Sequence, residues 1–374
     1  MPTDNHMTTA LVSERLHNQK LSSPTFKQPV DVVRWFGAVQ AQDFHGAKWA
    51  LGLRMRKATN ASIEEAFNRG EILRTHLLRP TWHFVAPEDI RWMLQLTGPR
   101  IKASCAAVYR QYELDEALCK RSNRAIAKAL TGGKPLIRAE LREVLKRVGV
   151  VADDTVRFAY ILLRAELDGI VCSGPRRGNQ FTYALLDERV SASKQLTGDE
   201  ALAELTRRYF AGHGPASLTD FVWWSGLTTN EARRGIALLD RDLLAAQIDE
   251  TTYWSSLART NSTPKTKPSS SSSESHLLPA YDEYNVAYKN RQHVFDQRSV
   301  AQMTAWGALG PTVIVDGRLV GIWKGTLNRN AIAVEVTPAI ALTKRDQTAV
   351  MKAAERYAAF LNVPLAKLTF RNTD

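Results

Sequence analysis

The segment ILRTHLLRPTWHFV, residues 72–85, decides the fold that we expect for this chain. Threonine, histidine, tryptophan, phenylalanine and valine recur in it, and Arg79-Pro80 interrupts the run, so it predicts two short strands joined by a turn. Helical patterns precede it at residues 31–39, 46–55 and 62–69. Helices followed by a basic hairpin are typical of a winged helix.

The same order of helices and hairpin recurs twice along the chain. Helical patterns over residues 101–167 lead into a strand, a basic loop and a strand at residues 170–185. A third helical stretch, residues 200–239, leads into strand-like residues 243–254. The sequence therefore predicts three tandem winged-helix motifs. We place these units at residues 1–97, 98–195 and 196–260.

The C-terminal part of the chain has a different character. Residues 261–275 (NSTPKTKPSSSSSES) are rich in serine and lack an apolar anchor, which predicts a flexible linker. Beyond them, residues 312–315, the Asp316-Gly317 turn and residues 319–323 predict a β-hairpin. We therefore expect a mainly β, barrel-like domain over residues 276–374, and an α+β fold class for the whole chain.

Composition limits the classes of function. The chain has 374 residues, and its 50 Lys and Arg outnumber its 38 Asp and Glu to give a net charge of +12. This excess favours a polyanionic partner such as nucleic acid, although a generally basic protein would have the same balance. No window approaches the ~20 apolar residues of a membrane span, so we expect a cytoplasmic protein that does not enter membranes.

Several kinds of chemistry find no support in the sequence. It contains no Gly-x-Ser-x-Gly nucleophile elbow, no P-loop and no Gly-x-Gly-x-x-Gly after a strand, so we expect no cofactor. Its three cysteines are widely spaced and read as reduced core residues. His76 and His83 lie on the first predicted hairpin without a third ligand nearby, so we expect no metal.

The triplet Gln40-Ala41-Gln42 places two uncharged amides near the end of an apolar run. Taken alone it is a weak signal, because such residues often serve as hydrogen-bonding groups at helix ends. In a helix the two side chains would lie about 200° apart, so joint action requires a non-helical backbone. Asp43, which follows directly, is a rival candidate for activating a water molecule.

Five segments together resemble the AlkZ-type DNA glycosylases, which are also described as a winged-helix DNA-binding family. They are VVRWFGAVQAQDFHGAKWALGLR (32–54), LRTHLLRPTWHFVAPEDIRWML (73–94), SLTDFVWWSGLTTNEARR (217–234), LLPAYDEYNVAYKNR (277–291) and VIVDGRLVGIWK (313–324). In that family three winged helices and a β-barrel surround a DNA channel, and a Gln-x-Gln or Gln-x-Asp motif excises alkylated purines. The resemblance implies that Gln40 and Gln42 are catalytic, in the form seen in members that unhook interstrand crosslinks.

Two amides suffice for this chemistry only if the lesion is already a good leaving group. An N7-alkylated purine carries a positive charge, so it departs without strong acid assistance. A glutamine carbonyl can accept a hydrogen bond from the attacking water and face the developing positive charge of an oxocarbenium-like transition state. An amide is no true base, and the motif contains no lysine for a lyase step. We therefore expect a monofunctional enzyme restricted to cationic lesions.

The resemblance also suggests supporting residues without fixing their roles. Thr81, His83 and Asp282 are placed near the DNA channel, although each could equally pack or cap a helix. We expect Trp223 and Trp224, inside an apolar helix, to belong to the core. The candidates for DNA contacts are basic or polar residues of hairpin turns and hairpins, any of which could be solvated loop residues instead: Arg79, Arg176, Arg177, Asn179, Arg318 and Lys324.

Two functions remain open at this point. The first is a DNA glycosylase that hydrolyses the N-glycosidic bond of N7-alkylpurines, with crosslinks as a further expected substrate. The alternative is a winged-helix regulator that binds DNA without chemistry, because the fold alone would serve both. Either protein would bind double-stranded DNA. We expect a monomer that is cytoplasmic and associates with the nucleoid when bound to DNA.

Overall fold

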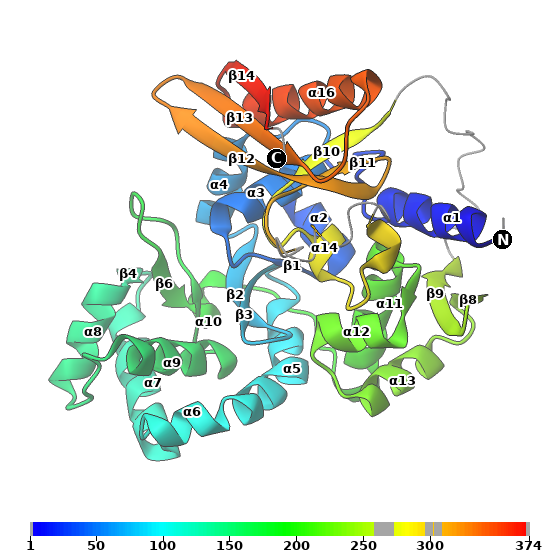
Figure 1. The fold of residues 1–374 in the computed structure, drawn as a ribbon. Coiled ribbons are helices and arrows are strands. Elements are labelled where there is room, and N and C mark those ends of the chain that lie inside the picture. Colours follow the sequence, from blue (N-terminus) through cyan, green and yellow to red (C-terminus); the bar gives the residue numbers. More distant parts are fainter. Residues whose placement is uncertain (1–2, 258–272, 296–301, 303–308, 372–374) are drawn as a thin grey trace.

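The computed structural model describes residues 3–257, 273–295, 302 and 309–371. Its helices and strands form three units of similar order and a C-terminal sheet, which Figure 1 colours along the chain. The predicted linker, residues 261–275, lies outside the described residues except for its last three. No helix in the described ranges is long and apolar enough to cross a membrane.

The first unit contains the predicted hairpin. Strands β2 (Leu73–Leu77) and β3 (Thr81–Val85) pair in an antiparallel register, with the turn at Arg79 and Pro80 between them. This confirms the prediction for residues 72–85. The remaining elements of the unit are α2 (Pro29–Phe36), β1 (Ala38–Gln40), α3 (Phe44–Leu53) and α4 (Asn60–Arg69). The sheet order is β1-β3-β2.

The other two units repeat this arrangement. The second has α7 (Glu116–Leu130), β4 (Leu136–Ile137), α8 (Arg138–Arg147), α9 (Thr155–Leu167), β5 (Val171–Ser173) and β6 (Thr182–Leu185). The third has α11 (Gly198–His213), β7 (Ala216–Ser217), α12 (Leu218–Ser225), α13 (Thr229–Leu238), β8 (Leu243–Ile248) and β9 (Thr251–Ser256). In every unit the order is helix, strand, helix, helix, strand, strand. The first strand of each unit pairs with the last, which lies in the centre of its sheet.

Two boundaries differ from the sequence prediction. The helix expected over residues 31–39 ends at Phe36, because Gly37 has a φ of 84° and the chain then joins the sheet as β1. The boundary expected between residues 97 and 98 falls inside a helix, which runs on through Gly98 and Pro99. This helix, α5 (Ile90–Ser104), joins the first unit to α6 (Ala106–Gln111).

The C-terminal sheet has the order β10-β11-β12-β13-β14, and among the described residues its two edge strands do not pair into a barrel. The expected barrel-like closure is therefore not found. The predicted hairpin is confirmed, with Asp316 and Gly317 at positive φ between β11 and β12. The elements are β10 (Ser275–Leu278), α14 (Glu283–Val286), η2 (Gln292–Val294), β11 (Thr312–Val315), β12 (Arg318–Asn328), β13 (Ala331–Pro338), α16 (Lys344–Leu361) and β14 (Leu365–Phe370).

Helix α16 explains why the sheet stays open. It connects β13 to the parallel strand β14 and packs between the sheet and helices α3 and α4 of the first unit. Phe360 of α16 approaches so closely that a Cβ at Gly52 of α3 would lie 2.7 Å from its ring. Because helices cover this face, the sheet buries its apolar side without closing on itself.

The first unit lies at the centre of the molecule. One apolar cluster joins its helices to the C-terminal sheet, and a second joins its hairpin to the other two units. Figure 1 shows the first unit (blue) below the sheet (orange and red) and between the second (teal) and third (green) units. Helix α1 (Thr3–Asn18) packs against α11 of the third unit. Gln40 and Gln42 therefore belong to the unit that contacts all other parts of the protein.

Candidate active site

Gln40 ends strand β1, and Gln42 lies in the bend that follows it, beside the central strand β3. Gln40 pairs with His83, and the Ala41 N–H donates to the Trp82 carbonyl at 2.8 Å. This backbone is not helical, so the roughly 200° separation that a helix would impose on the two side chains is absent. The geometric requirement stated from the sequence is met.

The two amides differ in exposure but share one feature. Gln40 is 6% exposed, and its Oε1 accepts a hydrogen bond from Arg79 Nη2 at 3.3 Å. Gln42 is exposed, and its Oε1 accepts from the Trp82 N–H at 3.3 Å. Each carbonyl oxygen therefore has one donor that orients it and a second lone pair left to accept from another molecule.

Glu283 anchors the strand from behind. Its carboxylate is fully buried, and it accepts from the Gln40 N–H at 2.7 Å, His213 Nε2 at 3.0 Å and Trp224 Nε1 at 3.0 Å. Burial alone would raise the pKa of Glu283, but the hydrogen bond and charge of His213 outweigh it and hold the pKa below its ordinary value. An ionised carboxylate therefore contacts the backbone N–H of the same residue, Gln40, whose side-chain amide is a candidate for catalysis.

Sequence reasoning missed Glu283, although its neighbour Asp282 was a candidate. Asp282 is buried in a two-bond ion pair with Arg54, at 2.8 and 2.9 Å, and its Oδ1 caps α14 through the Tyr284 N–H. These contacts occupy Asp282 and fix the helix on which Glu283 lies. The adjacent acid in the PAYDEY segment was the only sequence signal for Glu283.

His83 and Thr81 lie on β3, opposite the amides. Burial lowers the pKa of His83 to about 4, and the positive charge of Arg79 acts in the same direction. The ring is therefore neutral at physiological pH, and its Nδ1 lies 2.9 Å from the Thr81 carbonyl oxygen. If Nδ1 carries the proton, Nε2 is left as an acceptor. Thr81 Oγ1 is buried without a hydrogen-bond partner among the described residues.

Asp43 is committed to a local role. It is the N-cap of α3, and its Oδ1 accepts from the His45 N–H at 3.1 Å. Asp43 is exposed, and a Cβ at Gly46 would lie 2.7 Å from its Oδ2. The cap explains an acid at this position without catalysis.

The candidate DNA-contacting residues do not form one cluster. Arg79 alone touches the amides. The side chain of Arg176 is 5% exposed and packs on the rings of Phe44 and Phe181, so it joins the first two units rather than extending into solvent. Arg177 is exposed but pairs with Glu140 at 2.7 Å. Asn179 and Lys324 are exposed, and Arg318 Nη1 donates weakly to the Phe295 carbonyl at 3.4 Å.

The two adjacent tryptophans of α12 have different environments. Trp224 is 1% exposed, as predicted for the core, but Trp223 is 36% exposed, so the core prediction is wrong for it. Neighbouring residues in a helix lie about 100° apart, which turns one indole inward and the other toward the surface. The Trp223 indole donates to the Val286 carbonyl at 2.9 Å and lies against Arg79.

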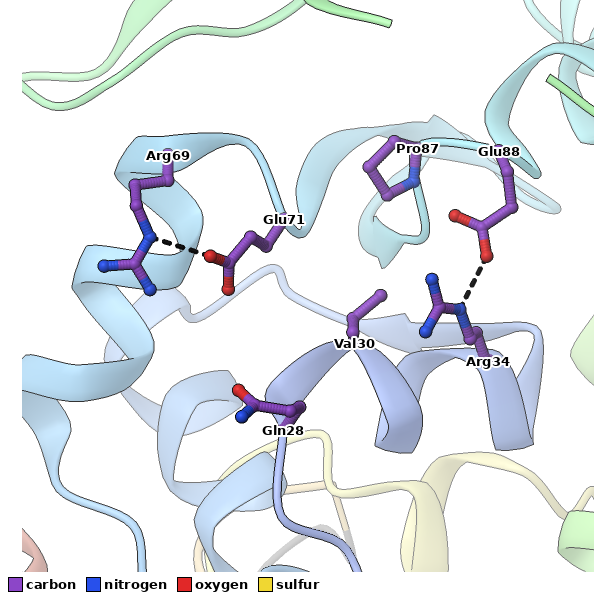
Figure 2. Close-up of a pocket in the computed structure, with 7 residues that line it drawn as sticks. All are labelled: Gln28, Val30, Arg34, Arg69, Glu71, Pro87 and Glu88. Carbon is purple, nitrogen blue, oxygen red and sulfur yellow. Dashed lines mark hydrogen bonds and ion pairs between the residues drawn. The ribbon is translucent and has the colours of Figure 1, made fainter. Parts of the chain in front are cut away.

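A cavity between α2, the end of α4 and the segment of Pro87 and Glu88 lies away from the amides. It has a volume of about 450 Å³, and its charged side chains pair with each other, Arg34 with Glu88 and Arg69 with Glu71 (Figure 2). None of the candidate site residues lines it. Because its charges are already neutralised within the protein, this cavity offers no reactive group. In the described part of the chain, no three His, Cys, Asp or Glu residues gather as a metal site.

Comparisons with known proteins agree with this fold. A family model described as DNA glycosylase AlkZ-like matches residues 33–360. The interstrand DNA cross-link repair glycosylase of Streptomyces sahachiroi is 25% identical over 327 residues, 83% of this chain and 85% of that protein. The solved structure of the Streptomyces sahachiroi DNA glycosylase AlkZ superposes with a TM-score of 0.78 and 22% identity, and covers 97% of this chain and 98% of its own.

The fold thus defines an α+β protein of the same architecture as a DNA repair enzyme. The family match extends over most of the chain. The chain belongs to the AlkZ-like DNA glycosylase family, and it is therefore an enzyme that acts on DNA. This decides against the alternative of a regulator without chemistry.

Proposed function

We propose that the enzyme hydrolyses the N-glycosidic bond of cationic N7-alkylpurines with a water molecule held by Gln40 and Gln42. The observation that carries this proposal is the pair of oriented amide oxygens. Each has one protein donor and a free lone pair, and both lie beside the same central strand. Two such acceptors can hold a water molecule by its two O–H groups.

The charges around the amides favour lesions that are already activated. The ionised carboxylate of Glu283 lies behind Gln40, where it stabilises positive charge that develops on the sugar. His83 is neutral, so it does not act as an imidazolium that protonates a leaving base. An enzyme without a general acid releases bases that leave as neutral molecules, as N7-alkylpurines do. It should therefore act as a monofunctional glycosylase on cationic lesions.

The topology supports a specific mode of DNA binding. We infer that the three units are winged helices, because each has the order helix, strand, helix, helix, strand, strand with the third strand central. We keep the division into units at residues 1–97, 98–195 and 196–260 and a C-terminal domain at 276–374. Around the amides, these units would hold duplex DNA by its backbone. We further propose that the protein acts as a monomer at the bacterial nucleoid.

Crosslinked DNA is the proposed natural substrate. The relative from Streptomyces sahachiroi is named an interstrand DNA cross-link repair glycosylase. Gln42 is exposed and Gln40 lies just below the surface, so the amides are open to a lesion that is too bulky for a closed pocket. Hydrolysis at one N7-linked purine would release one strand from the other.

A panel of three DNA substrates tests this function. We expect base release from duplex DNA with 7-methylguanine, strand separation of a duplex crosslinked through two guanine N7 atoms, and no release of the uncharged lesion ethenoadenine. All three are resolved on a denaturing gel after alkaline cleavage of abasic sites. Release of ethenoadenine at a rate similar to that of 7-methylguanine would contradict the restriction to cationic lesions.

A further inference from the structure

Two arginines from distant parts of the chain lie against one indole ring beside the amides. The Cζ of Arg79, in the β2–β3 turn, lies 5.3 Å from the Trp223 ring centroid. The Cζ of Arg291, after α14, lies 5.7 Å from the same centroid. We call Arg79 and Arg291 the arginine pair. Because Arg79 also donates to Gln40, the pair adjoins the proposed site of hydrolysis.

Neither arginine of this pair forms a direct ion pair with a carboxylate of the described residues, although the charges of Glu283 and Asp220 act on Arg79 and Arg291 from a greater distance. Arg79 Nε and Arg291 Nη2 are buried without a hydrogen-bond partner among those residues. Burial lowers the pKa of Arg79. Burial, and then the charge of Arg79, lowers the pKa of Arg291. Buried like charges destabilise the protein unless an anion approaches them.

Two other arginines of the protein, Arg54 and Arg208, are paired with carboxylates. Arg54 and Arg208 each form two hydrogen bonds to one aspartate, Asp282 and Asp89 respectively. Unpartnered guanidinium nitrogens also occur elsewhere in the chain, for example in Arg54 and Arg189. What distinguishes the arginine pair is its place: both guanidiniums lie against one indole beside the amides, and neither forms an ion pair with a carboxylate of the described residues.

The surrounding backbone holds both arginines in place. At Gly226, the C-cap of α12, a Cβ would lie 2.4 Å from the Leu78 carbonyl oxygen, so glycine allows the β2–β3 turn to rest on this helix. The loop before Arg291 is fixed by Asp220, which accepts from the N–H groups of Lys289 and Asn290. Figure 1 shows the β2–β3 turn, α12 and the α14 segment meeting at the centre of the molecule.

We propose that the arginine pair binds a backbone phosphate of the DNA strand that carries the lesion. A phosphodiester is the anion that DNA presents along its whole length, and guanidinium groups bind it through paired N–H donors. The indole of Trp223 supports both guanidiniums without competing for the anion. The phosphate would also neutralise Arg79, whose charge otherwise opposes positive charge on the sugar next to Gln40. This inference rests on the proposed function, which supplies the DNA strand.

A scan with uncharged linkages tests the phosphate site. Duplexes carry 7-methylguanine on a 2′-fluorinated sugar, which resists hydrolysis, and one methylphosphonate at each successive linkage around the lesion. Equilibrium binding is measured for the wild type, Arg291→Gln and Arg291→Lys. We expect the wild type to lose roughly tenfold in affinity at one linkage, as for a hydrogen bond to a charged group. Arg291→Gln should bind unmodified DNA roughly tenfold more weakly and, because only Arg79 is left to contact the phosphate, be clearly less sensitive to that linkage than the wild type.

The controls separate this contact from a general charge effect. Arg207→Gln removes the same charge from an exposed residue of α11 that pairs with Glu204, and it should keep the wild-type sensitivity. Arg291→Lys retains a charge and should restore part of the sensitivity. Equal responses of wild type and Arg291→Gln at every linkage would overturn the phosphate site. A further outcome is that Arg291→Gln reduces the sensitivity to one linkage while the wild type releases no 7-methylguanine from an ordinary duplex. In that case the phosphate site stands and the proposed function fails.

Discussion

Glu283 connects the segment that carries Gln40 and Gln42 to the third unit through one carboxylate. The residue lies 243 positions from Gln40 in sequence, yet it holds the Gln40 N–H and the side chains of His213 and Trp224. Three donors converge on a fully buried group, so both the position of β1 and the negative charge behind it depend on this residue.

Replacing Glu283 by glutamine should weaken the fold at neutral pH. The amide has the same shape, but its NH₂ group must face one of the three donors, which leaves buried groups without partners. We expect Glu283→Gln to lower the free energy of unfolding by about 2–4 kcal/mol, measured by urea denaturation at pH 7. The control Glu71→Gln, at an exposed ion pair, should change it by less than about 1 kcal/mol. If both variants changed the free energy of unfolding by the same amount, the three hydrogen bonds to Glu283 would not contribute specially to stability.

His83 should make stability fall in mild acid. Its pKa is about 4 in the folded protein, against about 6.5 in an unfolded chain, so below pH 6.5 the unfolded state binds the proton first. As the pH falls from 6.5 to 5, this difference lowers the free energy of unfolding by about 2 kcal/mol. Above pH 6.5 it has almost no effect. In His83→Gln this contribution is absent, so its deficit relative to the wild type should shrink as the pH falls from 7.5 to 5. The free energy of unfolding of both proteins is measured by urea denaturation at pH 7.5 and at pH 5. A deficit of the variant that is the same at both pH values would contradict a neutral buried imidazole.

At the level of elements, the β2–β3 turn depends on its contact with the end of α12. Gly226→Ala places a Cβ at a φ of 70° and 2.4 Å from the Leu78 carbonyl oxygen. We expect it to displace the turn that carries Arg79, weaken DNA binding and lower the unfolding free energy by more than about 2 kcal/mol. The matched control is Gly149→Ala, where φ is 71° and nothing lies within 4 Å of the added Cβ. Gly149→Ala has the same backbone strain but no clash. If both variants bound DNA equally weakly, displacement of the β2–β3 turn would not be the cause of the weaker binding.

Local patterns predicted the elements that depend on their own residues. The hairpin at residues 72–85 and the Asp316-Gly317 turn both follow from alternation and turn residues. The strand β1 could not be predicted in this way, because three residues become a strand only by pairing with β3. Barrel closure failed as a prediction because α16 covers the sheet.

The candidate site was predictable only in part for the same reason. The triplet Gln40-Ala41-Gln42 was recognisable from its flanking segments, and Arg79 from its position in a basic turn. Glu283 and Arg291 reach the site through folding of distant chain, and no local pattern marks them. The contrast between exposed Trp223 and buried Trp224 likewise depends on which helix face meets the core.

At the scale of the whole molecule, one core joins the first unit to the C-terminal sheet. Phe360 of α16 packs on Trp49 of α3 with ring centroids 4.9 Å apart. We expect Phe360→Ala to lower the free energy of unfolding by about 3–5 kcal/mol and to speed amide hydrogen exchange in α3 as well as in α16. Leu327→Ala, at a side chain that is 60% exposed, should leave both unchanged. Faster exchange confined to α16 would mean that the sheet and the first unit are stabilised separately.

The central claim is that Gln40 and Gln42 hold the water that attacks the sugar. Single-turnover release of 7-methylguanine from duplex DNA tests it most directly, with wild type, Gln40→Ala combined with Gln42→Ala, and the control Gln95→Ala at an exposed position of α5. We predict that the double variant binds the duplex but releases the base roughly 100-fold more slowly, or slower still, while the control matches the wild type. Base release by the double variant at the wild-type rate would contradict the claim.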